Sequence, residues 1–114
     1  MAFRANIEKI TIKNNYYRKV IHTTSNMQLV IMSLKPNEEI GSEIHSHTSQ
    51  FIRVEEGFAK AIINNKRYYL KSGDAIIIPP GARHNIINTS SEELKLYTIY
   101  TPPEHNPKTK QYNK

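Results

Sequence analysis

The residues best suited to do chemistry are two histidines separated by one residue, His45 and His47, within the stretch EIHSHTSQFIRVEEG at 43–57. Side chains two residues apart on a strand point to the same side, so we expect both imidazoles on one face. Neutral imidazole is a common ligand of zinc, iron, nickel and copper. Because the chain contains no cysteine, any metal must be held by His, Asp, Glu or an amide oxygen, and a Cys nucleophile is excluded. The pair indicates a metal site, although two exposed strand histidines also arise by chance.

A third histidine, His84, lies in the stretch GDAIIIPPGARHNIIN at 73–88. The residue types predict a turn at 73–74, a buried strand at 76–78 and a rigid corner at 79–81. The corner would return the chain toward the interior, where His84 opens the next strand. Since a β-sandwich offers a dry concave interior, three histidines could converge on one ion there.

Both stretches resemble the sequence motifs of the cupin superfamily. The second cupin motif has the form G-x5-P-x-G-x2-H-x3-N, and none of its fixed positions is missing here. It is matched at Gly73, Pro79, Gly81, His84 and Asn88.

The first cupin motif, G-x5-H-x-H-x3,4-E-x6-G, is matched less closely. His45 and His47 stand at its two histidines and Gly57 at its last glycine, but Gln50 stands where the family has glutamate. Two residues separate His47 from Gln50 instead of three or four, and the upstream glycine, Gly41, is displaced.

The resemblance implies an all-β fold, the cupin or RmlC-like jelly roll, described as a double-stranded antiparallel β-barrel. It also implies a divalent ion, whether Zn, Mn, Fe or Ni, with His45, His47 and His84 on the histidine ligands and Gln50 on the carboxylate ligand. An amide oxygen can coordinate but brings no charge, so the ion would be a stronger Lewis acid and less firmly retained. Glu43 is the rival fourth ligand, because it shares the expected strand face with the first two histidines. We favour Gln50, whose spacing from the following glycine fits the motif.

Short strands separated by turn signals would position these side chains. They recur at intervals of about eight to twelve residues, which is typical of an antiparallel sandwich or barrel. Asn64-Asn65 predicts a tight two-residue hairpin turn, since asparagine tolerates positive φ. The expected strands are 7–12, 28–34, 51–54, 59–63, 66–70, 75–78, 85–88 and 94–100.

Some single residues outside the motifs carry expectations of their own. Phe51 and Arg53 alternate with their neighbours and are expected on the face opposite the pocket. Tyr97 or Tyr100 could line the pocket mouth. His105 matches no motif and is expected to face solvent.

The length of 114 residues predicts a single cupin domain at 1–101, followed by a basic tail rich in proline and lysine at 102–114. The tail has too little apolar surface to order itself alone, but it could pack against a partner subunit. Half of the net charge of +6 comes from Lys108, Lys110 and Lys114, and the other basic residues are scattered, so we expect no nucleic-acid partner. No apolar run is long enough for a signal peptide or a membrane span, which predicts a cytoplasmic protein without a membrane partner.

The chain looks most like the small bacterial cupins labelled mannose-6-phosphate isomerase-like. That resemblance implies an isomerase-like enzyme whose ligand is a small sugar or sugar phosphate. Such a reaction needs a metal that polarises a carbonyl and a base that moves a proton, and Glu43, Glu55 and Glu56 offer no unambiguous base. Two alternatives stay open: a non-catalytic module that holds a small molecule or an ion, and a metal-dependent dioxygenase, which three histidines and an open position would suit. We also expect a homodimer, paired through the N-terminal strand or the Phe51 and tyrosine faces.

Overall fold

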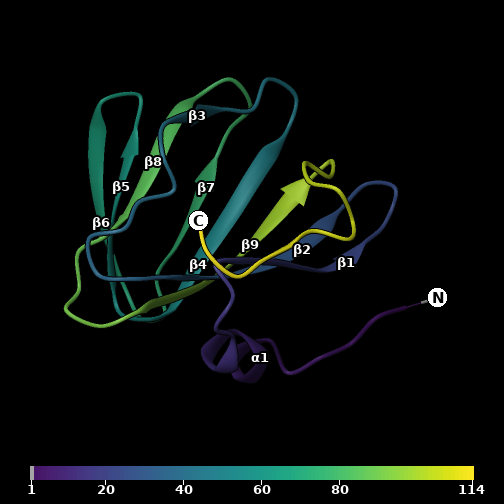
Figure 1. Ribbon diagram of the computed structural model, residues 1–114. Helices are drawn as coiled ribbons and strands as arrows, with labels where there is room; N and C mark the ends of the chain where they lie inside the picture. The colour runs from purple at the N-terminus through teal and green to yellow at the C-terminus, as the bar shows by residue number, and fades with distance from the viewer. Residues whose placement is uncertain (1) are drawn as a thin grey trace.

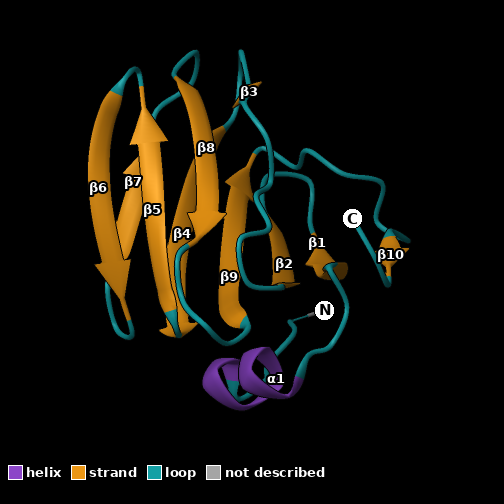
Figure 2. Cartoon of the chain, turned by 60° about the vertical axis from the view of Figure 1, so that its left-hand side comes forward, coloured by secondary structure: helices purple, strands orange, loops and turns teal. Residues whose placement is uncertain are grey.

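The computed structural model of the chain describes residues 2–114 and shows two antiparallel sheets packed face to face (Figures 1 and 2). Within these residues, one sheet has six strands in the order β10-β1-β2-β9-β4-β7, and the other has four in the order β3-β8-β5-β6. The elements are α1 (Ile7–Lys13), β1 (Arg18–Thr23), β2 (Gln28–Leu34), β3 (Glu43–Ile44), β4 (Ser49–Glu56), β5 (Phe58–Ile63), β6 (Lys66–Lys71), β7 (Ala75–Ile78), β8 (Arg83–Asn88), β9 (Leu94–Thr101) and β10 (Lys110–Gln111).

The predicted all-β jelly roll is confirmed, and it takes the form of a sandwich of antiparallel sheets instead of a closed barrel. The two sheets form an open sandwich, in which β10 and β7 are the edges of one sheet and β3 and β6 the edges of the other. The core lies between them and is filled by aliphatic side chains of both sheets, each of which contributes roughly 1.5–3 kcal/mol when fully buried. Fully buried members are Val30, Met32, Leu34, Ile52, Val54, Ile86, Leu94 and Leu96.

Strand β4 shows how the alternation of side chains divides inside from outside. Gln50, Ile52 and Val54 are buried between the sheets, whereas Phe51 and Arg53 lie on the outer face. The expectation that Phe51 and Arg53 face away from the interior is therefore confirmed. Gln50 takes an inward position at the start of this strand, at the same end of the sandwich as the corner that follows β7.

The hairpin predicted at Asn64-Asn65 is also confirmed. Both asparagines have positive φ, 48° and 70°, as a two-residue turn of the primed type requires. The turn is tied to the start of β8, because Asn64 N donates to Arg83 O at 2.8 Å and Arg83 N donates to the Asn64 side chain at 3.0 Å.

The strand expected at 7–12 is wrong, because this segment forms helix α1. Asn6 caps the helix by accepting a hydrogen bond from Lys9 N at 2.9 Å. The apparent slip in the alternation, from Ile7 to Ile10, is the three-residue spacing of one helix face. An N-terminal edge strand that could pair subunits is thus absent from residues 2–114, and no helix there is long and apolar enough to span a membrane.

The segment after β9 packs back onto its own chain. Strand β10 pairs with β1, with Arg18 opposite Gln111 and Lys19 opposite Lys110. Figure 2 shows β10 beside β1 at the edge of the larger sheet. The tail has little apolar surface, as expected, and it is ordered by strand pairing and polar contacts.

Candidate functional site

Two of the three motif histidines lie side by side. His84 is buried at the start of β8, and His45 lies in the loop just after β3, with its ring centroid 5.0 Å from that of His84. Their proximity follows from the short antiparallel ladder between β3 and β8, in which Glu43 is opposite His84. Gly81 N also donates to His45 O at 2.8 Å, so the corner at 79–81 is bound directly to the loop.

The two rings have different polar neighbours: His84 is bonded to a backbone carbonyl, and His45 lies between two carboxylates. His84 Nδ1 is 3.0 Å from Ala82 O, and because a carbonyl can only accept, Nδ1 carries the proton and Nε2 keeps its lone pair. His45 Nδ1 is 3.2 Å from Glu104 Oε1, while its Nε2 is 3.8 Å from Glu43 Oε2. His84 thus has an outer hydrogen bond at one nitrogen and a free lone pair at the other, which is the usual arrangement of metal-ligating histidines.

His47 lies apart from this arrangement. The strand assumed for 45–47 does not form: β3 ends at Ile44, the chain bends at 46–47, and β4 begins at Ser49. His47 is exposed on the bend, whereas Thr48 is buried and takes the inward position. Within residues 2–114 no group of three or more His, Cys, Asp or Glu side chains is arranged to hold a metal ion. That the motif residues bind a metal ion therefore stays a prediction.

The side chain of Gln50 is buried, and only one of its two polar atoms has a hydrogen-bond partner among the described residues. Its Nε2 donates to Thr98 Oγ1 at 3.0 Å, but Oε1 has no hydrogen-bond partner within residues 2–114. A buried acceptor left unpaired costs about 1–3 kcal/mol, so a donor or a cation at this oxygen would be stabilising. The break in the strand before β4 explains how Gln50 can face inward at an odd spacing from both histidines.

Tyr100 and His105 line the same end of the sandwich. The buried ring of Tyr100 meets His45 edge-on at 5.9 Å and His105 at 5.1 Å, and His105 Nε2 is 3.3 Å from the Tyr100 hydroxyl. Burial raises the pKa of Tyr100, so its hydroxyl stays protonated. Burial, and then the positive charge of Arg18, lowers the pKa of His105 to about 4.

Glu104 and His105 are the site residues that the sequence reading missed. His105 was expected to face solvent, and this is wrong, because it is half-buried against Tyr100. No sequence motif marks these two residues, and their place follows from the pairing register of the larger sheet. Since Ser49 pairs with Thr101, the chain that follows β9 must emerge next to the loop that carries His45.

The donors present suit a divalent ion. Two imidazole nitrogens, His45 Nε2 and His84 Nε2, and the orphaned oxygen of Gln50 are of the ligand types that zinc, manganese, iron and nickel accept. Gln50 is opposite Tyr100 in the β4–β9 ladder, and the Tyr100 ring touches His45. The orphaned oxygen and the two rings therefore belong to one end of the sandwich.

Comparison with known proteins agrees with this fold. The family model described as "Cupin domain" matches residues 30–100 of the chain. The chain belongs to the cupin family. A crystal structure of BH2720 from Bacillus halodurans superposes on this cupin with a TM-score of 0.97 at 37% identity, over 99% of this chain and 90% of the other.

Two curated relatives are similar to most of this cupin. Uncharacterized protein L612 of Acanthamoeba polyphaga mimivirus is 48% identical over 106 residues, which are 90% of this chain and 66% of that protein. Uncharacterized protein YrkC of Bacillus subtilis (strain 168) is 38% identical over 109 residues, which are 90% of this chain and 59% of that protein. The chain thus spans less than two thirds of the length of either relative. A general cupin function is thus supported, and none of these relatives names a cofactor.

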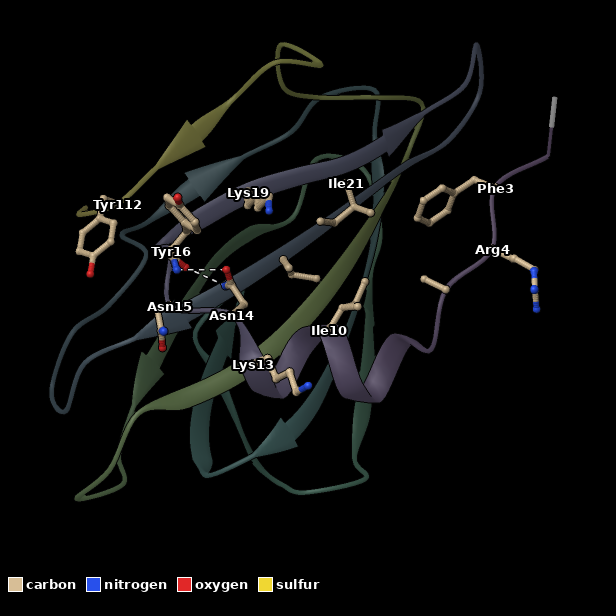
Figure 3. Close-up of a pocket in the computed structure, with 12 residues that line it drawn as sticks. Phe3, Arg4, Ile10, Lys13, Asn14, Asn15, Tyr16, Lys19, Ile21 and Tyr112 are labelled. Atoms are coloured by element: carbon tan, nitrogen blue, oxygen red, sulfur yellow. Dashed lines mark hydrogen bonds between the residues drawn. The ribbon is translucent and has the colours of Figure 1, made fainter.

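A groove of about 590 Å³ lies elsewhere, between the N-terminal segment, α1 and the outer side of β1 (Figure 3). Lys19 and Tyr16 are among its lining residues, and Asn14 shapes its wall by hydrogen bonds to both backbone groups of Tyr16. The groove is outside the sandwich, so it is separate from the pair His45 and His84.

Proposed function

We propose that this cupin binds one divalent metal ion through His45, His84 and Gln50, and that it acts as an isomerase on a small sugar or sugar phosphate. The observation that carries the proposal is that three polar side chains lie at one end of the sandwich. The rings of His45 and His84 are 5.0 Å apart, His84 keeps Nε2 available, and the buried Gln50 Oε1 lacks a partner among residues 2–114. His47 is exposed in this structure and would join the ligands only if the bend at 46–47 changed shape.

The proposed chemistry is the transfer of a proton between adjacent carbons of a hydroxy-carbonyl compound. When bound, the ion would polarise the carbonyl oxygen and stabilise negative charge on it. Glu43 would act as the base, because its carboxylate is about a third exposed and lies 3.8 Å from His45 Nε2, next to the proposed ion. Tyr100, protonated and buried beside His45, would exclude water from the inner side.

A positive charge close to Tyr100 and His105 favours an anionic substrate. Arg18 lies on β1, opposite Met32 of the core, and its Nε is buried without a hydrogen-bond partner within residues 2–114. Its charge acts on both Tyr100 and His105. This guanidinium is held by a hydrogen bond from Nη1 to Gln111 Oε1 at 2.8 Å, and its positive charge would favour a phosphate or carboxylate on the substrate.

Metal titration and proton exchange test the proposal together. The purified chain, made without a histidine tag, should bind one Zn, Mn, Fe or Ni ion and should exchange a carbon-bound proton of fructose 6-phosphate with solvent deuterium. Glu43→Gln should keep the metal and lose the exchange. A chain that takes up no metal would contradict the metal site. Tight metal binding without exchange would favour the non-catalytic module, and oxygen uptake with iron would favour the dioxygenase.

The homodimer remains a proposal, and the outer face of the larger sheet supports it. Leu29, Ile99, Phe51 and Ile77 are opposite one another on four neighbouring strands and form an apolar row. Ile77 is 71% exposed at the end of this row, so a second copy of the chain would bury it. Light scattering should show a dimer that Ile77→Asp converts to a monomer. A wild-type monomer at micromolar concentration would contradict the proposal.

A further inference from the structure

We propose that Glu104, from the segment after β9, is a positioning residue of the site. Its carboxylate fixes the proton of His45 on Nδ1 and so leaves Nε2 as the donor that faces the ion. The inference deepens the proposed metal-binding function and rests on it. Glu104 is outside both cupin motifs, and its role follows from contacts made 59 residues along the chain from His45.

The segment that carries Glu104 is held by a buried clamp. Gln28 is fully buried, and its Oε1 accepts hydrogen bonds from Glu104 N at 3.2 Å and His105 N at 2.9 Å. Its Nε2 donates to His105 O at 2.7 Å and to Thr23 Oγ1 at 3.1 Å. Every polar atom of this side chain is therefore used, and three of its four bonds fix the backbone of residues 104–105.

A second contact holds the same segment from the other side. His105 packs edge-on against Tyr100, and Tyr100 is opposite Gln28 in the β2–β9 ladder. The clamp and the aromatic contact thus belong to one pair of strands. Glu104 is placed by the rigid sandwich, although it lies in a segment without regular structure.

Two carboxylates compete for the proton of His45. Glu104 Oε1 is 3.2 Å from Nδ1, whereas Glu43 Oε2 is 3.8 Å from Nε2. The nearer acceptor favours the Nδ1–H tautomer, in which Nε2 can bind a cation. Without Glu104, the remaining acceptor is Glu43, which draws the proton to Nε2 and blocks the nitrogen that the ion needs.

Nitrogen NMR of the metal-free protein tests the tautomer directly. The ¹⁵N shifts of His45, recorded at about pH 8 where an ordinary histidine is neutral, should report Nδ1–H in the wild type. Glu104→Ala should shift the population toward Nε2–H, and Glu104→Gln should restore most of the wild-type pattern, because its amide oxygen can still accept. Glu43→Gln should leave the Nδ1–H tautomer in place.

Metal affinity gives the second readout. Competition with a chromophoric chelator should show zinc bound about 10–100-fold more weakly by Glu104→Ala, the usual loss when an outer partner of a ligating histidine is removed. Glu56→Gln, at the exposed end of β4, is the charge-matched control and should bind as the wild type does. Thermal unfolding of each variant verifies that it is folded.

The two readouts separate failure of this inference from failure of the proposed function. If Glu104→Ala leaves the nitrogen shifts of His45 unchanged, the positioning role is overturned, whatever the protein binds. If the wild type binds no zinc but the shifts respond as expected, the positioning role stands and the metal site is wrong. Equal zinc affinity of the wild type and Glu104→Ala would also overturn the inference.

Discussion

The two histidines of the candidate site are held in different ways. His84 is part of strand β8, paired with Glu43 on one side and Ile63 on the other, and its ring bonds to a carbonyl two residues away. His45 lies in a loop, and its ring is positioned by carboxylates that are each about a third exposed. One half of the site is therefore preorganised by the sheet, whereas the other half depends on the nearby Glu43 and on Glu104 from a distant segment.

The largest effect should follow from removal of the preorganised half. His84→Ala should weaken metal binding by more than about 100-fold, because loss of a ligand exceeds the ~10–100-fold cost of losing an outer partner. Addition of His45→Ala should complete the loss of metal while the sandwich stays folded, as circular dichroism would show. Undiminished metal content of the double variant would refute the site.

The next largest effect concerns the far end of β8. Asn88 is fully buried, and its amide donates to Leu34 O and Glu92 O, while its oxygen accepts from Ser90 N. Asn88→Ala should lower the free energy of unfolding by about 2–4 kcal/mol, because buried backbone groups lose their partners. Denaturant unfolding measures this, and the exposed Asn113→Ala is the control. A loss below about 0.5 kcal/mol would show that Asn88 is not structural.

A smaller effect is expected from His105. Because its pKa is about 4 in the folded chain and near 6.5 when unfolded, the unfolded state binds the extra proton as the pH falls. Stability should be fully present above about pH 6.5 and should fall toward about pH 4. His105→Gln should flatten this part of the stability profile. Proton NMR that gives His105 an ordinary pKa would contradict the expectation.

The smallest effect is expected from His47, which sharpens the contrast between the histidines. His47→Ala should change metal affinity by less than about 3-fold, well under the loss expected of a ligand. Isothermal titration of the single variant measures it. A loss as large as that of His84→Ala would mean that the bend at 46–47 rearranges to bring His47 to the ion.

The sequence predicts best what depends on neighbours along the chain. The asparagine pair at 64–65, the alternation of β4 and the segment that ends in His84 all follow from local geometry, and the cupin motifs name the fold. The failures have physical causes. The spacing of Ile7 and Ile10 fits a helix face as well as an irregular strand, and the bend at 46–47 replaces the strand assumed for the histidine pair.

The remaining misses come from contacts between distant segments. Glu104 reaches His45 through the clamp of Gln28, whose partners are 76 and 77 residues away. A polar tail gives no hydrophobic pattern, so sequence periodicity could not place it. The cupin motifs could not predict the open sandwich either, because they specify turns and ligands but not whether the two sheets join at their edges.

Anomalous diffraction from a crystal soaked with zinc tests the central claim most directly. The account predicts one peak about 2.0–2.2 Å from Nε2 of both His45 and His84 and within reach of Gln50 Oε1. A zinc position at His47 alone, or no bound zinc beside the two rings at saturating concentration, would contradict it.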